Sequence, residues 1–148
     1  PAALSQQFLG NPNEIHAFGK LHPNEIDEET HTFMRFANGS RSNFVLSART
    51  TLPHWAGVSG SKGAITFGTP WFTPSSITFH ESTFNGAQST WVDELGLPEH
   101  LGLTHQVHAF AQYVDQGLLE GPLYTHHDSL SNIKTVLEIG NLIGTRYK

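Results

Sequence analysis

The feature that most constrains this chain is a change in the spacing of its apolar residues. From residue 14 to about residue 92, apolar and polar residues alternate along short segments that Gly, Pro and Asn separate, which is typical of β-strands. From Leu103 onward, apolar residues return every three or four positions, which is typical of helices. Strands joined by short turns pair antiparallel, and here helices follow them. We therefore expect an α+β fold, with an open-faced, mostly antiparallel sheet of about six strands and helices packed on one face.

The alternating part is predicted to form six strands, and Ser89–Val92 could add another at an edge of the sheet. The pair Asn38-Gly39 predicts a hairpin, because both residues accept positive φ. The segment Gly60-Ser61-Lys62-Gly63 predicts a second tight turn. The six expected strands cover residues 14–21, 29–37, 41–50, 55–59, 64–67 and 76–81.

Three segments are predicted to be helical. Residues 2–9 have the pattern of a helix end, and we expect that helix to continue something upstream. A second helix starts near Leu103, and a third starts at Asp128 or Ser129, with Asp128 as its N-cap and Gly144 just after its end. The buried face of the third helix is expected to consist of Leu130, Ile133, Val136, Leu137 and Leu142.

The second and third strands are apolar on both sides. Because an antiparallel sheet with one face in water is usually polar on that face, this pattern favours a sheet whose open face meets another protein surface. The alternative is that these are scattered exposed apolar residues, which are normal on soluble proteins. The residues expected on the contact face are Phe33, Arg35, Val45 and Arg49.

Composition narrows the classes of function. The 148 residues suit a single domain, and the net charge of −5 without any basic run argues against nucleic acid and anionic membranes as partners. The chain has no cysteine, which excludes disulfides and thiol chemistry. No run of apolar residues is long enough to cross a membrane.

Ten histidines are an unusually high number, and they could belong to a metal site. His105 and His108 are three positions apart on a predicted helix, with His100 nearby in sequence. Few carboxylates accompany them and there is no H-E-x-x-H pattern, so surface or pocket-lining histidines are the favoured interpretation. The chain also lacks the G-x-G-x-x-G and G-x-S-x-G motifs, and the turn at Gly60–Gly63 lies between strands rather than before a helix.

The order of several short motifs resembles the C-terminal domain of the Gfo/Idh/MocA oxidoreductases, nearest to the dihydrodiol dehydrogenase and NADP-dependent xylose dehydrogenase group. The matching segments are Phe36-Ala-Asn-Gly39, Val58-Ser-Gly-Ser-Lys-Gly63-Ala-Ile-Thr-Phe67, Pro70-Trp-Phe-Thr-Pro74, Gly121-Pro122, His127-Asp-Ser-Leu130, Ile143-Gly144 and Tyr147. Each motif is weak alone, and together they span nearly the whole chain.

This resemblance implies that residues 1–148 form a single substrate-binding and oligomerisation domain of a cytoplasmic NAD(P)-dependent oxidoreductase acting on a sugar or diol. It implies that a Rossmann domain carrying the nucleotide site and the catalytic Lys and Tyr or His would precede Pro1, so that this chain binds no cofactor and holds no catalytic residue or metal. It also implies homo-oligomerisation through the open sheet face. The residues that it places at the substrate pocket are Lys20, Trp71, His100 and His105.

Two other functions remain open at this point. The chain could be a stand-alone module that dimerises through its sheet and catalyses nothing. It could also be a small metal-dependent enzyme that uses the histidine cluster.

Overall fold

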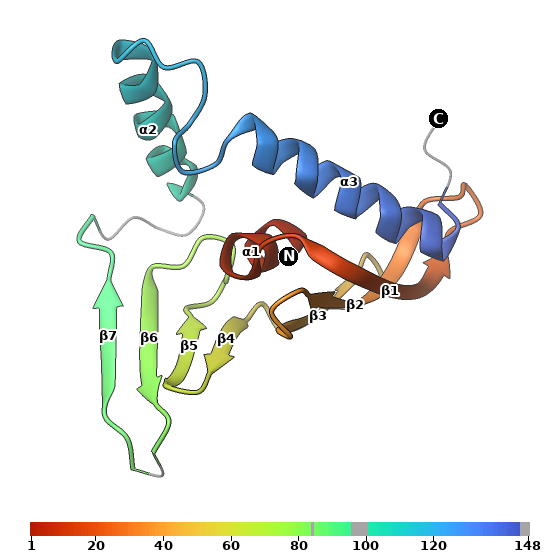
Figure 1. Ribbon diagram of the computed structural model, residues 1–148, viewed down its shortest axis with the longest axis horizontal. Helices are drawn as coiled ribbons and strands as arrows, with labels where there is room; N and C mark the ends of the chain where they lie inside the picture. The colour runs from red at the N-terminus through yellow and green to blue at the C-terminus, as the bar shows by residue number, and fades with distance from the viewer. Residues whose placement is uncertain (84, 96–100, 146–148) are drawn as a thin grey trace. The chain divides into compact units, whose positions relative to one another are not determined.

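The computed structural model describes residues 1–83, 85–95 and 101–145. In chain order the elements are α1 (Ala2–Leu9), β1 (Pro12–Leu21), β2 (Asp27–Phe36), β3 (Arg41–Ser47), β4 (Ala56–Gly60), β5 (Gly63–Phe67), β6 (Ser76–Glu81), β7 (Gln88–Val92), α2 (Leu103–Asp115) and α3 (His126–Ile143) (Figure 1). All strand pairs are antiparallel, so the expected α+β class with open antiparallel sheet is confirmed.

The seven described strands form two sheets, in the orders β1-β2-β3 and β4-β5-β6-β7, and the expected edge strand is present as β7. In the sequence between β3 and β4, residues 48–55 form no strand. This segment contains Pro53, which has no backbone N–H to donate to a neighbouring strand. The chain divides accordingly into two compact units, Pro1–Leu52 with Glu120–Lys148, and Pro53–Leu119.

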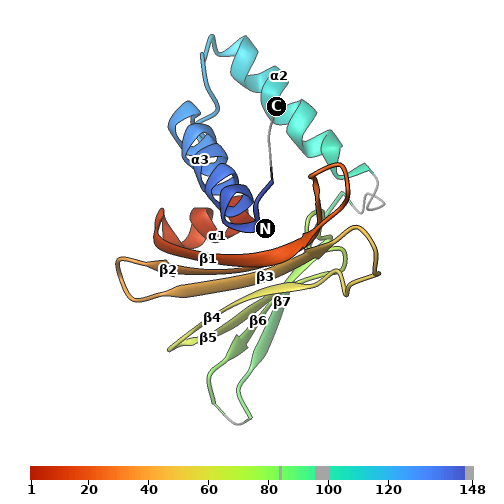
Figure 2. The ribbon, with the colours of Figure 1, turned by 90° about the vertical axis from the view of Figure 1, so that its right-hand side faces the viewer.

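In the first unit, α1 and α3 lie on the same side of the three-stranded sheet (Figure 2). The side chains of β2 alternate as its sequence predicts, and the even-numbered ones face these helices. Met34 and Phe36 are 0% and 2% exposed and form the centre of the core. The hydroxyl of Ser5 on α1 lies 2.6 Å from that of Ser42 on β3, which ties the first helix to the sheet.

The hairpin predicted at Asn38-Gly39 joins β2 and β3. The last pair of the ladder is Arg35 with Arg41, and Gly39 alone takes a positive φ, of 83°. The Asn38 side chain instead accepts a hydrogen bond from the Ser40 N–H at 3.0 Å. Asn38 therefore stabilises the turn through its side chain rather than through a left-handed backbone.

Helix α3 begins earlier than predicted. Its N-cap is Thr125, whose hydroxyl accepts from the Asp128 N–H, while the Asp128 carboxylate accepts from the Thr125 N–H at 2.8 Å. The prediction of Asp128 as N-cap was therefore wrong, because Asp128 is the third residue of a reciprocal capping box. Gly144 ends the helix in the left-handed conformation, as expected.

The buried face of α3 also differs from the expectation. The buried residues are Thr135, Ile139 and Gly140, on the side that lies against the sheet. The expected buried face was therefore wrong, because all five of its residues are exposed: Leu130, Ile133, Val136, Leu137 and Leu142.

In the second unit, the four-stranded sheet has one apolar face and one polar face. Ile65, Ile77 and Phe79 share a face by register, while Thr66, Thr78 and His80 share the other. Cross-strand hydrogen bonds link the polar face, between Thr66 and His80 at 3.0 Å and between Thr78 and Thr90 at 3.0 Å. Helix α2 belongs to this unit and has no buried residue.

Within the described parts of the chain, no helix combines the length and the hydropathy that crossing a membrane requires.

Candidate functional site

The face of the three-stranded sheet that lies opposite α1 and α3 carries an exposed aromatic cluster. The rings of Phe18 on β1 and His31 on β2 stack with their centroids 4.8 Å apart and their planes 7° apart. Phe33 and Val45 share this face by register and are 39% and 41% exposed. Three of the expected contact residues, Phe33, Arg35 and Val45, therefore share one exposed surface.

Charged side chains on this face are paired. The Glu14 carboxylate contacts His16 Nε2 at 2.8 Å and Arg35 Nη1 at 3.1 Å. The hydrogen bond with His16, followed by the charge of Arg35, lowers the pKa of Glu14 below its usual value. His31 and Glu29 form a similar pair at 2.8 Å. The face therefore combines exposed apolar rings with charged side chains that have partners.

Lys20, one of the expected pocket residues, belongs to a cluster of three charged residues. Its Nζ lies 2.8 Å from Glu28, and Arg49 Nε lies 3.3 Å from the other oxygen of the same carboxylate. The Glu28 side chain is 7% exposed, whereas those of Lys20 and Arg49 are 72% and 67% exposed. The hydrogen bond from Lys20 is the main cause that lowers the pKa of Glu28, and the charge of Arg49 adds to it.

This cluster fixes the end of the sheet. A register shift in the β1–β2 ladder occurs between Lys20 and Leu21, and Arg49 lies in the bend that follows β3. Glu28 thus joins the end of β1 to the bend after β3, and both cations keep their charged groups at the surface.

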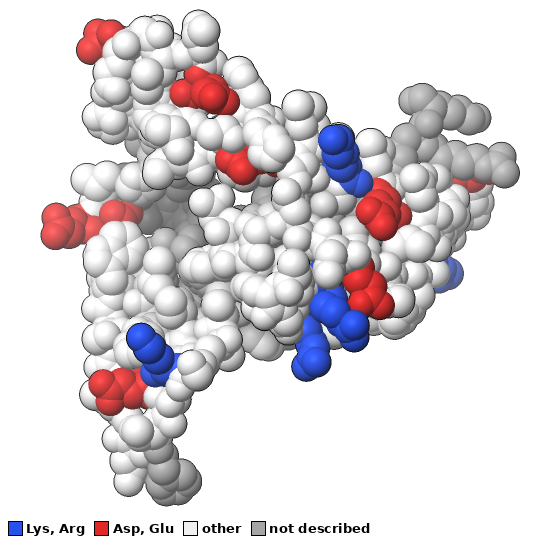
Figure 3. All heavy atoms as spheres, in the orientation of Figure 1, with Lys and Arg blue, Asp and Glu red and all other residues white. Residues whose placement is uncertain are grey.

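On the face seen in Figure 3, Lys and Arg atoms lie beside Asp and Glu atoms, and most of the surface belongs to other residues.

Trp71 lies in the second unit, in the Pro-rich loop between β5 and β6. The backbone N–H of Trp71 donates to the backbone carbonyl of His54 at 3.1 Å. Its ring meets that of Phe72 edge-on at 5.8 Å, and Phe72 meets His54 in the same way at 5.9 Å. Trp71 is half-buried and Phe72 is 58% exposed, so the loop presents an aromatic surface held by its own contacts.

His105 lies in the first turn of α2 and pairs with Asp93, with its Nε2 3.1 Å from Oδ2. His108 contacts Gln112 at 3.1 Å on the same helix, so the two histidines have different partners. His100 lies outside the described residues. Among the residues that are described, no three or more His, Asp or Glu side chains are grouped closely enough to hold a metal ion.

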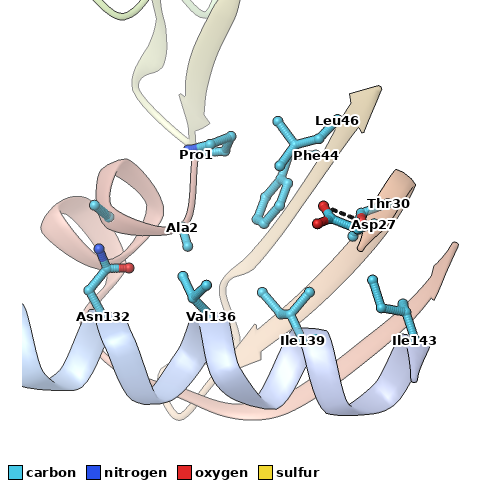
Figure 4. A pocket seen from close by; sticks show the side chains of 12 residues that line it. Pro1, Ala2, Asp27, Thr30, Phe44, Leu46, Asn132, Val136, Ile139 and Ile143 are labelled. Atoms are coloured by element: carbon cyan, nitrogen blue, oxygen red, sulfur yellow. Dashed lines mark hydrogen bonds between the residues drawn. The ribbon is translucent and has the colours of Figure 1, made fainter. Parts of the chain in front are cut away.

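The first unit also contains a cavity of about 190 Å³ between α1, α3 and the strands β2 and β3 (Figure 4). Its floor includes Thr30 and Ile139, which are 3% and 7% exposed. Its walls are mostly aliphatic and aromatic. The residues that line it are Pro1, Ala2, Ala3, Asp27, Thr30, Phe44, Leu46, Asn132, Val136, Ile139, Gly140 and Ile143.

The sequence did not single out the residues that organise these sites. Glu28 belongs to an acidic run, Asp27-Glu28-Glu29, and its carboxylate meets Lys20 and Arg49 next to the register shift between Lys20 and Leu21. Asn132 was missed because it lies on the small-residue side of α3. The signal in the sequence for the Lys20–Glu28–Arg49 cluster was the acidic run at the start of β2, which follows Lys20 near the end of β1.

Comparison with known proteins identifies relatives among dehydrogenases. No protein-family profile matches the chain. The trans-1,2-dihydrobenzene-1,2-diol dehydrogenase of Xenopus tropicalis is 24% identical over 120 residues, which are 80% of this chain and 36% of that enzyme.

Solved structures share the fold. The UDP-N-acetylglucosamine 3-dehydrogenase of Acidithiobacillus ferrooxidans matches with a TM-score of 0.75 and 10% identity over 97% of this chain and 44% of that one. A levoglucosan dehydrogenase, solved with NADH and levoglucosan, matches with a TM-score of 0.69 and 14% identity over 95% of this chain and 46% of that one. The expected resemblance to the C-terminal domain of Gfo/Idh/MocA-type oxidoreductases is confirmed as a likeness of fold, and the chain spans less than half the length of these relatives.

Proposed function

We propose that this chain is the substrate-binding and dimerisation part of an NAD(P)-dependent oxidoreductase that acts on a sugar or a diol. The observation that carries the proposal is the match of 97% of the chain to one dehydrogenase and 95% to another, together with the sequence likeness to a diol dehydrogenase. The relatives are about twice as long or longer, so the proposed activity belongs to the whole enzyme.

The proposed substrate residues are Lys20, Trp71, His105 and His100. Lys and His side chains can hydrogen-bond the hydroxyl groups of a sugar or diol, and an aromatic ring can pack on the carbon face of the substrate. The Lys20 side chain is held by the Glu28 carboxylate, and the Trp71 ring is in edge-on contact with the Phe72 ring. Such support allows a side chain to be positioned before the substrate arrives.

The nicotinamide cofactor would supply the hydride acceptor or donor in the whole enzyme. The described strands of this chain pair antiparallel, and no G-x-G-x-x-G motif joins a strand to a helix. These residues do not fit a dinucleotide site of that kind, so we place cofactor binding and the acid–base residue on another part of the enzyme.

The open face of the three-stranded sheet is the proposed dimer contact. Phe18, Phe33 and Val45 give it exposed apolar surface, and the pairs of Glu14 with His16 and Arg35 add charges that already have partners. Apolar contact area with few unpaired charges suits a protein interface.

The test uses the enzyme that contains this segment. We expect NAD(P)-dependent oxidation of at least one member of a panel of levoglucosan, UDP-N-acetylglucosamine and trans-dihydrobenzenediol. Lys20→Met and Trp71→Ala should raise KM about tenfold or more, whereas Lys62→Met, in the β4–β5 turn, should leave it unchanged. Absence of any nucleotide-dependent turnover would contradict the proposed activity, and equal effects of the two lysine variants would contradict the assigned site.

A further inference from the structure

We propose that Asn38, at the tip of the β2–β3 hairpin, is the asparagine of the folded chain that deamidates fastest. Its side-chain amide is lost as ammonia, and an aspartate or isoaspartate remains. The proposal concerns the first unit alone and does not depend on the oxidoreductase assignment. Asn38 is exposed in the structure, so water reaches its side chain.

The reaction requires two adjacent residues and water. The backbone nitrogen of Gly39 gives its proton to the solvent and attacks Cγ of Asn38. A bond forms between these two atoms, the Cγ–Nδ2 bond breaks, and Nδ2 takes a proton from water and leaves as ammonia. Water then opens the five-membered ring. Attack at Cγ gives aspartate, and attack at the backbone carbonyl carbon gives isoaspartate, without any oxidant or reductant.

The residue that follows an asparagine decides how easily the backbone nitrogen reaches Cγ. Glycine has no Cβ and permits this close approach better than any other residue. In the sequence only Asn38 and Asn85 precede a glycine. The sequence therefore leaves two candidate positions, and the structure distinguishes them.

The two glycines differ in the space around them. A Cβ built on Gly39 would meet nothing within 4 Å, whereas a Cβ on Gly86 would lie 2.7 Å from the carbonyl oxygen of Glu81. Ring closure rotates the peptide group between asparagine and glycine, and the open position allows that rotation. The Gly39 N–H must first release the Phe36 carbonyl, which accepts from it at 2.9 Å. Opening of one hydrogen bond at an exposed hairpin tip costs little free energy.

The hairpin also places a hydrogen-bond donor on the reacting amide. The side-chain oxygen of Asn38 accepts from the backbone N–H of Ser40 at 3.0 Å. This oxygen gains negative charge when the Gly39 nitrogen attacks Cγ, and an N–H that already points at it stabilises that charge. The turn therefore supplies both free space and a donor to Asn38.

The two products should affect the hairpin differently. Aspartate keeps the length of the backbone, and its carboxylate oxygen can accept from the Ser40 N–H as the asparagine does. Isoaspartate continues the chain through Cβ and Cγ and so adds one backbone atom between Phe36 and Ser40. The Phe36 N–H donates to the Ser40 carbonyl at 3.0 Å, and this bond closes the hairpin. We expect the isoaspartate form to be less stable than the wild type.

The reaction is followed by peptide mapping with mass spectrometry, on the folded chain and on the chain in urea, both at mildly alkaline pH. In urea, Asn38 and Asn85 should convert at similar rates because a glycine follows each. In the folded chain, Asn38 should convert several-fold faster than Asn85. The proposal is overturned if Asn85 converts as fast as Asn38 in the folded chain. It is also overturned if Asn38 stays intact there after the chain in urea has converted.

A variant tests the role of the Gly39 nitrogen. Gly39→Asp adds a Cβ, while aspartate tolerates the φ of 83° at this position. It should slow the conversion of Asn38 several-fold and leave that of Asn85 unchanged, and circular dichroism verifies that the variant is folded. An unchanged rate at Asn38 would overturn the proposed ring closure.

The effect on stability is measured by chemical denaturation of the isoaspartate form, separated by ion exchange, with Asn38→Asp as the matched control. The isoaspartate form should unfold at lower denaturant concentration than Asn38→Asp. Equal midpoints would contradict the proposed effect of the extra backbone atom.

Discussion

The Phe18 and His31 rings stack across β1 and β2 on the exposed face of the sheet, with their centroids 4.8 Å apart. Phe18 is 70% exposed, so this pair leaves a large aromatic surface in contact with solvent. Phe33 belongs to the next pair of the ladder on the same face, opposite His16. Exposed apolar surface of this extent, on a sheet face that the helices of its own unit do not cover, is the physical basis of the proposed dimer.

The first prediction is that this face mediates self-association. We expect the chain to be a dimer or larger at concentrations on the order of tens of micromolar, and Phe33→Glu to shift it to monomer, because a buried unpaired carboxylate is costly. Light scattering coupled to size-exclusion chromatography measures the mass. Leu123→Glu, at an exposed loop position, should not change it. A monomeric wild-type chain would contradict the proposed contact face.

The second prediction concerns acid stability. The hydrogen bond from Lys20 lowers the pKa of Glu28 from its ordinary value of 4.5 in the folded state. Around these two pKa values the unfolded chain binds more protons than the folded chain. The ionised Glu28 carboxylate therefore stabilises the folded state above pH 4.5, and this stabilisation is lost as pH falls through the lowered pKa. Lys20→Met should flatten the dependence of unfolding free energy on pH below that value, as urea titrations at several pH values would measure.

Lys62→Met is the matched control for this prediction. Lys62 is exposed in the β4–β5 turn, so Lys62→Met should leave the dependence of the unfolding free energy on pH below 4.5 as in the wild type. If the unfolding free energy of Lys20→Met depended on pH below 4.5 as that of the wild type does, Lys20 would not stabilise the ionised form of Glu28.

The third prediction is that the capping box stabilises α3. Thr125→Ala removes the hydroxyl that accepts from the Asp128 N–H. It should lower the unfolding free energy by about 1 kcal/mol, whereas Thr125→Ser, which keeps the hydroxyl, should lose much less. Chemical denaturation monitored by circular dichroism measures both. If the two variants were equally destabilised, the cap would not be the cause.

The fourth prediction concerns the close pairing of β1 and β2 at Gly19. A Cβ at this position would overlap the backbone carbonyl oxygen of Glu29 on the neighbouring strand. Gly19→Ala should therefore displace β1 and destabilise the fold by about 1–3 kcal/mol, the usual range for overpacking, as chemical denaturation would measure. Gly60→Ala serves as the control, because its Cβ would meet nothing within 4 Å. A fully stable Gly19→Ala chain would contradict this register of β1 on β2.

The strands could be predicted because their signal is local. The alternation from residues 29 to 36 follows from the fact that successive side chains of a strand point to opposite faces, and β2 alternates in this way. The turn after Phe36 was located correctly. Asn and Gly are compatible with several turn types, and the structure shows the hydrogen bonds of this one, from the Phe36 N–H to the Ser40 carbonyl and from the Gly39 N–H to the Phe36 carbonyl.

The sequence by itself determined the α+β class, the antiparallel order of the hairpins and the position of the helices, because periodicity and turn residues act over a few positions. Only the tertiary structure decided that Thr135, Ile139 and Gly140, rather than Leu130 and Ile133, face the sheet. It also decided that Glu28 meets Lys20 and Arg49, and that Asn132 lines a cavity. These outcomes depend on how closely distant segments pack, and a helix with apolar residues on more than one side does not specify which side is buried.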